Sequence, residues 1–144
     1  MAILGVLLTV SIPRFAATGE RLRTEQAAVE LSQLFRYAHE RAVAQSAEIV
    51  WVWDSEARRA RLQTVGDDGS AQWLDERSAR SAPLSETIAV HLERDGAPVD
   101  RVQFFPDGTS QPTSVSLARG QDTYTVSVDG TTGQALLTAG RAAR

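Results

Sequence analysis

The chain of 144 residues contains no cysteine and no lysine. The absence of cysteine excludes thiol catalysis, zinc or haem sites with cysteine ligands, and a disulfide framework. All fifteen basic residues are arginines and the formal net charge is −3, so no overall basic field would gather nucleic acid. The apolar fraction of 42% and the charged fraction of 23% are those of an ordinary folded protein with one domain.

Patterns of catalysis and metal binding are equally scarce. Serine is frequent, but the sequence has no Gly-x-Ser-x-Gly motif, no Gly-x-Gly-x-x-Gly motif and no P-loop. His39 and His91 lack the spacing of zinc ligands, and we expect them at the surface of a helix and on a strand face. Four loop aspartates could bind calcium but do not follow the EF-hand order: Asp67, Asp68, Asp107 and Asp129. The sequence therefore predicts no enzyme, no metal site and no cofactor.

The first thirteen residues, MAILGVLLTVSIP, form an uncharged apolar run that ends at Pro13. A membrane-spanning helix needs about 20 apolar residues, and this run is shorter. A secretory signal peptide would begin with a basic region and end in a small-residue cleavage site, and neither is visible. We therefore expect residues 1–18 to be the C-terminal half of a membrane-anchor helix whose first half lies upstream of Met1.

A helical period follows the apolar run, from Arg14 to about Ala47. Apolar side chains recur at steps of three and four residues, which predicts an amphipathic helix packed on a sheet. A coiled-coil partner helix is the alternative. The predicted apolar stripe consists of Leu22, Ala28, Leu31, Leu34, Phe35, Ala38, Ala42 and Val43. The predicted solvent face includes the pairs Glu20 with Thr24 and Arg36 with Glu40.

After Ala47 the apolar period changes to two, which indicates β-strands joined by turns. Strands are predicted at 49–53, 57–65, 71–74, 87–92, 102–105, 114–117, 124–128 and 134–138, with a loop at 75–84. Trp51 and Trp53 share one strand face, and we expect them in the core rather than stacked on a ligand. The predicted fold class is α+β, with a long N-terminal helix (19–47) on an antiparallel β-sandwich or curled sheet (48–144).

The N-terminal segment resembles that of type IV pilins and type II secretion pseudopilins. The resemblance lies in an apolar run that enters an amphipathic helix through a proline, and the matching residues are Ala2, Ile3, Leu4, Gly5, Leu7, Leu8 and Pro13. It implies that these residues anchor the chain in a membrane and assemble it with other subunits. The peptidase cleavage site, the methylated residue and the glutamate of that family would lie upstream of Met1.

The distal half resembles the minor pseudopilin H family (GspH/FimT-like). The matching segments are RVQFFPDGT at 101–109, SVSL at 114–117, YTVSV at 124–128 and GTTG at 130–133. The resemblance implies a structural minor pseudopilin of a type II secretion pseudopilus. It also implies a single-pass protein of the bacterial inner membrane, with residues 19–144 in the periplasm. The implied partners are other pseudopilins, the inner membrane and secretion-system components.

The C-terminal tail leaves an alternative function open. Arg141 and Arg144 resemble a Gly-Arg-x-Arg-like tail that members of the pilus-associated branch use to capture DNA, with one extra residue between the two arginines. In that alternative the chain is a minor type IV pilin that binds DNA for uptake. Two charges contact only a couple of phosphates, which predicts weak and salt-sensitive binding. A solvated tail without function is the simpler interpretation.

Overall fold

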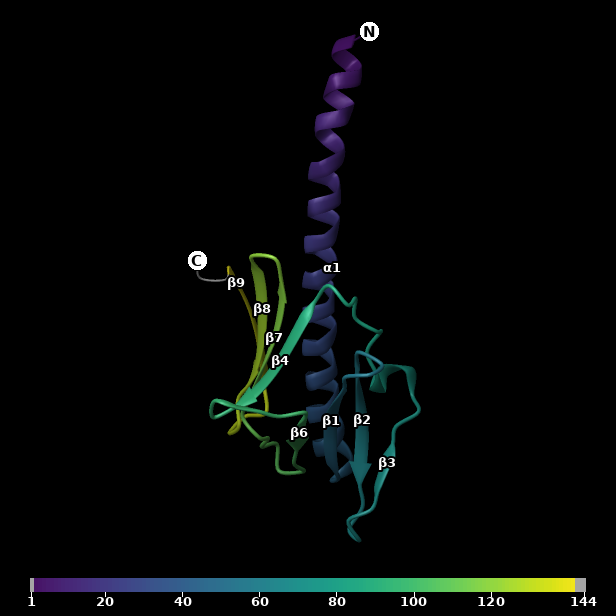
Figure 1. Ribbon diagram of the computed structural model, residues 1–144. Helices are drawn as coiled ribbons and strands as arrows, with labels where there is room; N and C mark the ends of the chain where they lie inside the picture. Colours follow the sequence, from purple (N-terminus) through teal and green to yellow (C-terminus); the bar gives the residue numbers. More distant parts are fainter. Residues whose placement is uncertain (1, 142–144) are drawn as a thin grey trace.

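The computed structural model describes the backbone of residues 2–141 and the side chains of 19 and 21–140. One uninterrupted helix, α1 (Ala2–Gln45), passes through both Pro13 and Gly19. Ser46 follows with a φ of 50°, and the Ala47 N–H donates to the Ala42 carbonyl at 3.1 Å. A residue in the left-handed conformation, together with a hydrogen bond from the next residue back to the last turn, is a common way to end a helix. Figure 1 shows the first half of α1 projecting away from the β-strands, which flank its second half.

The strands form two antiparallel sheets that flank the second half of α1. The first sheet has the order β3-β2-β1-β6, and the second has the order β5-β4-β7-β8-β9. Their bounds are β1 Glu48–Asp54, β2 Arg59–Val65, β3 Ala71–Trp73, β4 Ala89–Arg94, β5 Ala97–Pro98, β6 Arg101–Phe104, β7 Thr113–Arg119, β8 Asp122–Val128 and β9 Ala135–Arg141. The predicted α+β class, with a long N-terminal helix on antiparallel sheets, is confirmed.

Each predicted strand is present, and the differences are local. The strand expected from Ala57 begins at Arg59, because Asp54 Oδ1 accepts the N–H groups of Glu56 and Ala57 at 3.0 Å and Arg58 turns with a φ of 53°. The predicted loop 75–84 includes one turn of 3-10 helix, η1 (Arg77–Ala79), and the short strand β5 (Ala97–Pro98) lies outside the predicted strands.

The core lies between α1 and the inner faces of both sheets. The ring of Phe35 is at its centre, with its centroid 4.7 Å from that of Trp51 and 6.0 Å from that of Phe104. Such tilted aromatic pairs add about 0.5–1.5 kcal/mol each to the burial of their area. Trp51 is fully buried and Trp53 packs against the same cluster, as predicted from the strand pattern.

The predicted stripe of α1 is wrong at both ends. Leu22 and Val43 are 51% and 47% exposed, whereas Thr24, assigned to the solvent face, is only 1% exposed. The buried stripe runs through positions 24, 28, 31, 35, 38 and 42, with Ala27 and Leu34 beside it. Steps of four and three residues keep this stripe facing the sheets. Leu22 and Val43 lie outside that sector, so their hydrophobicity does not bring them into the core.

Candidate assembly surface

The projecting half of α1 contains the residues that the sequence assigned to membrane anchoring and assembly. The described backbone places them all on one helix: Ala2, Ile3, Leu4, Gly5, Leu7, Leu8 and Pro13. At 1.5 Å per residue, residues 2–18 extend for about 25 Å. Within residues 2–141, no helix contains a stretch long and apolar enough to cross a membrane.

A polar contact holds α1 where it leaves the sheets. Arg21 hydrogen-bonds Tyr124 and faces the carboxylate of Asp122 at the start of β8. The Tyr124 bond, followed by the charge of Asp122, raises the pKa of the Arg21 guanidinium above its ordinary value. Thr24 is buried one turn further along. This contact joins α1 to β8 near the point where the helix leaves the sheets.

The surface of α1 that faces away from the sheets is a second, continuous feature. Its residues recur at steps of four and three, as in the buried stripe, and all are exposed. They are Leu22, Gln26, Val29, Gln33, Arg36, Glu40 and Val43. Leu22, Val29 and Val43 are large apolar side chains that remain at the surface. This outer face combines apolar, amide and oppositely charged groups, which suits contact with another helix rather than a small ligand.

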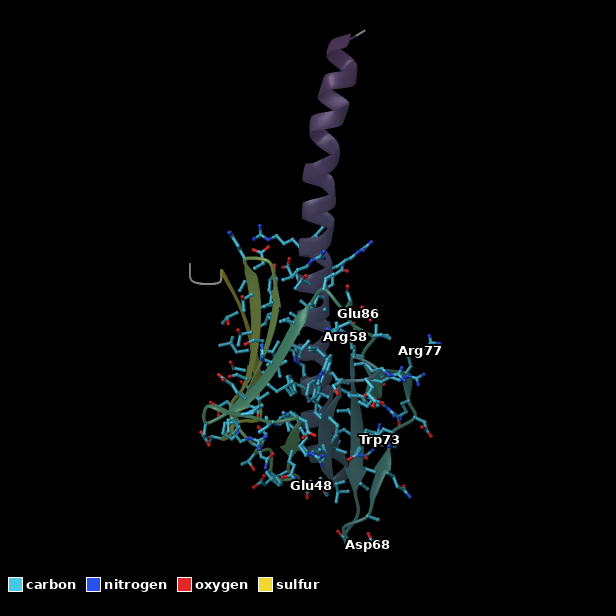
Figure 2. All side chains as sticks on the ribbon, viewed as in Figure 1. Glu48, Arg58, Asp68, Trp73, Arg77 and Glu86 are labelled. Carbon is cyan, nitrogen blue, oxygen red and sulfur yellow. The ribbon has the colours of Figure 1, made fainter. Side chains whose placement is uncertain are left out.

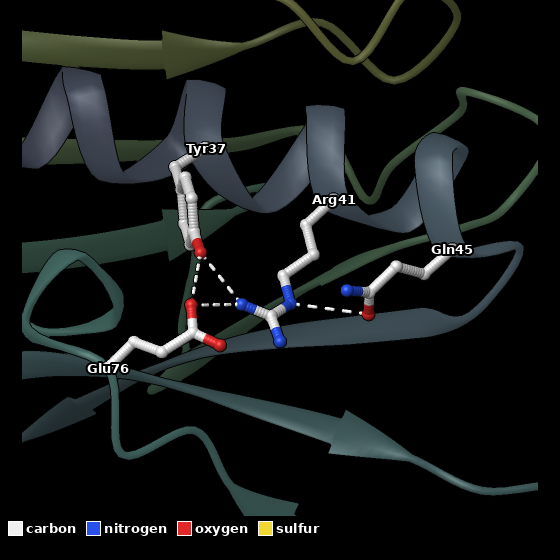
Figure 3. Close-up of polar contacts among 4 residues, drawn as sticks. All are labelled: Tyr37, Arg41, Gln45 and Glu76. Atoms are coloured by element: carbon white, nitrogen blue, oxygen red, sulfur yellow. Dashed lines mark hydrogen bonds and ion pairs between the residues drawn. The ribbon is translucent and has the colours of Figure 1, made fainter.

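The long connection between β3 and β4 is tied to α1 by the polar cluster in Figure 3. Tyr37 Oη donates to Glu76 Oε2 at 2.6 Å, and Arg41 Nη1 donates to Tyr37 Oη at 2.7 Å and pairs with Glu76 Oε2. Arg41 Nε also donates to Gln45 Oε1 at 3.3 Å. The hydrogen bond from Arg41, assisted by that from Tyr37, lowers the pKa of Glu76.

The side chains of two further residues, Glu30 and Arg58, fix the same connection. Glu30 Oε1 accepts the N–H of Ala82 at 2.7 Å, again from α1. Arg58, labelled in Figure 2, donates to the carbonyls of Leu84, Ser85 and Ile88, at 3.4 Å and 3.1 Å for the first two. The sequence predicted a loop here, but no local pattern reveals these partners, because they are 26 to 52 positions apart along the chain.

The turn between β8 and β9 lies against α1. A Cβ atom added to Gly133 would be 2.3 Å from His39 Cδ2 and 2.6 Å from the Gly108 carbonyl oxygen. His39 is therefore half-buried against this turn, whereas the sequence predicted a surface position; His91 is exposed on β4 as expected. A shallow pocket beside the turn is lined by Arg36, His39, Glu40, Gly133, Gln134 and Ala135.

Three of the loop aspartates accept hydrogen bonds from residues of their own turns. Asp129 Oδ1 accepts the N–H groups of Thr132 and Thr131, which lower the pKa of its carboxyl. Asp68 and Asp107 accept hydroxyl and N–H groups of Ser70 and Thr109 in the same manner. Across the part of the chain that the structure describes, no three histidine, aspartate or glutamate side chains come together as a metal site would require.

The predicted DNA-contact residues are at the edge of the described region. Arg141 is the last residue of β9, where its backbone is opposite Asp122. Its side chain, and residues 142–144 with Arg144, lie outside what the structure describes.

A long helix flanked by two antiparallel sheets, with half of its length projecting, is the architecture of a pilin-like subunit. The family model for the type II transport protein GspH matches residues 27–132, and the chain belongs to this family. The resemblance found from the sequence motifs is thereby confirmed.

Solved structures show the same fold. The minor pseudopilin EpsH from the type 2 secretion system of Vibrio cholerae is 18% identical with a TM-score of 0.67, over 81% of this chain and 97% of that chain. The type IV minor pilin FimU of Pseudomonas aeruginosa is 18% identical with a TM-score of 0.64, over 83% of this chain and 90% of that chain. No curated protein matches the sequence.

Proposed function

We propose that this protein is a structural minor pseudopilin of a type II secretion pseudopilus and that it assembles through α1. One observation supports this most directly: α1 is continuous from Ala2 to Gln45, while the sheets cover only its second half. Membership of the GspH family and the likeness to EpsH support the same role. The role is structural rather than catalytic, and it uses no cofactor.

In this proposal the two halves of α1 have different tasks. Residues 1–18 belong to the membrane anchor, and Ala2, Ile3, Leu4, Gly5, Leu7, Leu8 and Pro13 contact lipid in the inner membrane and then neighbouring pseudopilin helices in the filament. Residues 19–144, with a helical part at 19–47 and a β domain at 48–144, lie in the periplasm. Other secretion-system components contact this domain. The uncharged sequence of residues 2–13 suits both lipid and helix contacts, because neither surrounding hydrates a charge.

The proposal is tested by placing a charge on the projecting helix. Leu8→Arg should remove the full-length protein from the membrane fraction and from purified pili, because an arginine in an apolar helix interface costs about 2.5–3.5 kcal/mol even in permissive membrane contexts. Thr87→Arg, on an exposed loop of the β domain, is the matched control and should leave both fractions unchanged. Equal recovery of the two variants in pili would refute assembly through this segment.

The likeness to FimU supports a second candidate, a minor type IV pilin. In this candidate the chain also binds DNA for uptake, as the resemblance of its C-terminal tail suggests. Its proposed DNA contacts are Arg141 and Arg144. Replacing both with alanine should then abolish binding of the full chain to short duplex DNA at low salt, since the chain has no overall basic excess. For a secretion pseudopilin the same double substitution should leave assembly intact. Salt-dependent DNA binding that disappears in the double variant would favour this candidate over the pseudopilin.

A further inference from the structure

Each sheet ends in two edge strands, and most of these edges are protected in the described structure. β5 is two residues long and contains Pro98, which has no N–H to offer. The edge of β6 is occupied by Gln111, whose N–H donates to the Gln103 carbonyl at 3.0 Å and whose side chain accepts the Gln103 N–H at 3.2 Å. β3 has three residues, and Trp73 at its end lies under the guanidinium of Arg61 at 4.2 Å. Shortness, proline and covering groups are the usual means of preventing strand addition.

The edge formed by β9 has none of these protections. The strand is seven residues long, and its first six residues, ALLTAG, contain neither proline nor charge. The N–H of Asp129 donates to the Gln134 carbonyl at 2.9 Å, which sets the phase of the β8–β9 ladder. In an antiparallel ladder, every second residue directs its backbone N–H and carbonyl groups toward the neighbouring strand, and the residues between direct theirs away from it. In β9 the backbone groups of Leu136 and Thr138 therefore bond to β8. Those of Ala135, Leu137 and Ala139 point away from the sheet. Over residues 2–141, no backbone hydrogen bond joins these outward groups to another element.

The sheet face beside this edge is also uncharged. Val115, Leu117, Val126 and their neighbours face the core, so the alternate positions of β7, β8 and β9 face outward. These outward positions are Ser114, Ser116, Ala118, Thr123, Thr125, Ser127, Leu136, Thr138 and Gly140. Cross-strand hydroxyl pairs link Ser114 with Ser127 at 3.5 Å and Ser116 with Thr125 at 3.4 Å. Leu136, 65% exposed, lies at the border between this face and the open edge.

We propose that β9 accepts an extended, uncharged strand of a neighbouring pilus subunit, which extends the second sheet across the subunit boundary. The inference rests on the proposed function for the presence of a neighbour. The outward backbone groups of β9 provide alternating donors and acceptors, and the chemical complement of that array is another β-strand. The outer face beside this edge offers an added strand hydroxyl and apolar contacts and no charge, which an uncharged strand matches. Leu136 supplies an apolar contact for the incoming strand.

The direction of β9 identifies which kind of strand fits. Figure 1 shows β9 running back toward the N-terminal end of α1, opposite to the direction of the helix. Two copies joined antiparallel through β9 would have their helices pointing in opposite directions, which subunits inserted from one membrane do not allow. We therefore propose that the occupant pairs antiparallel with β9, as all other strands of this sheet do with their neighbours, and is a strand that runs in the direction of α1 in a neighbouring subunit rather than β9 of a second copy.

The test uses the full chain in assembled pili of its natural host. A photo-crosslinking amino acid is placed at position 138, beside the open edge, or at position 91 on the exposed outer face of β4 as the matched control. We expect a crosslink from position 138 to an extended strand of another pilus subunit, mapped by mass spectrometry, at least tenfold stronger than from position 91. Ala139→Pro removes an outward N–H and leaves the bonds to β8, so it should abolish the crosslink, whereas Ala139→Val should retain it.

The outcomes separate this inference from the proposed function. A chain that is absent from pili overturns the proposed function, and the inference with it. A chain that enters pili but crosslinks equally from both positions, or to a helix, or to β9 of a second copy, overturns the inference alone. If Ala139→Pro lowers the melting temperature, Leu136→Lys provides the second test, because it adds a charge at an exposed position and should abolish the same crosslink without unfolding the sheet.

Discussion

Gly133→Ala should destabilise the protein far more than an alanine at another turn glycine. Gly133 has a φ of 68°, in the left-handed region that a side chain disfavours. The added Cβ would also be 2.3 Å from His39 Cδ2 and 2.6 Å from the Gly108 carbonyl oxygen. Both distances are shorter than Cβ contacts in real proteins, so the turn must move away from α1 or the histidine must leave its place.

The expected magnitude has two parts. The left-handed conformation costs a non-glycine residue about 1–2 kcal/mol, and overpacking costs about 1–3 kcal/mol, so the total is about 2–5 kcal/mol. Gly69→Ala isolates the first part, because Gly69 has a φ of 83° and no neighbour within 4 Å of its added Cβ. That control should lose only about 1–2 kcal/mol.

The free energy of unfolding is measured by urea denaturation of the full chain in a mild non-ionic detergent. Unfolding is monitored by tryptophan fluorescence. Trp51 is fully buried in the core and reports the loss of packing. A double variant adds a second check: in a His39→Ala background the cost of Gly133→Ala should fall, but not to the value for Gly69→Ala. The Gly108 carbonyl remains in the way after the ring is removed.

Two results would refute this reasoning. Equal losses for Gly133→Ala and Gly69→Ala would mean that backbone conformation alone requires glycine at 133 and that the turn does not pack on His39. An unchanged cost of Gly133→Ala in the His39→Ala background would assign the clash entirely to the Gly108 carbonyl.

Further predictions concern the helix and its polar tether. Leu31→Ala should cost about 2–5 kcal/mol because Leu31 is fully buried, whereas Leu22→Ala, at an exposed site of the same helix, should stay within about 0.5 kcal/mol in the same urea experiment; similar losses would show that the helical phase is wrong. Glu76→Gln should lower the melting temperature at neutral pH, because its carboxylate pairs with Arg41 and Tyr37. The folded state lowers the pKa of Glu76 below the ordinary 4.5, so the stabilisation is present above that value and disappears as the pH falls through the folded pKa. The melting temperatures of wild type and Glu76→Gln should therefore converge in acid, and a gap that persists at low pH would assign the effect to packing.

The sequence determines most of the secondary structure of this protein, because the relevant signals are local. The β-branched and aromatic composition of IVWVW at 49–53 and the alternation in YTVSV at 124–128 predict strands that the structure contains as β1 and β8. The three- and four-residue steps through Leu31, Leu34, Phe35 and Ala38 predict the buried side of α1. The motifs at 101–109 and 130–133 were enough to indicate the family, because turn residues occupy fixed places between those strands.

The tertiary structure decides which side chains of similar chemistry are buried and which are exposed, and which strand edges are paired. Leu22 and Thr24 exchange their predicted places because the sheets cover the side of α1 on which Thr24 lies, one turn before Ala28, whereas Leu22 lies on the opposite side. The cluster of Tyr37, Arg41 and Glu76 joins residues 35 to 39 positions apart, and only the path of the β3–β4 connection brings them together. The open edge of β9 follows from strand order for the same reason. A strand's own sequence sets its alternation, but whether its outer hydrogen-bonding groups have a partner depends on which strand lies beside it.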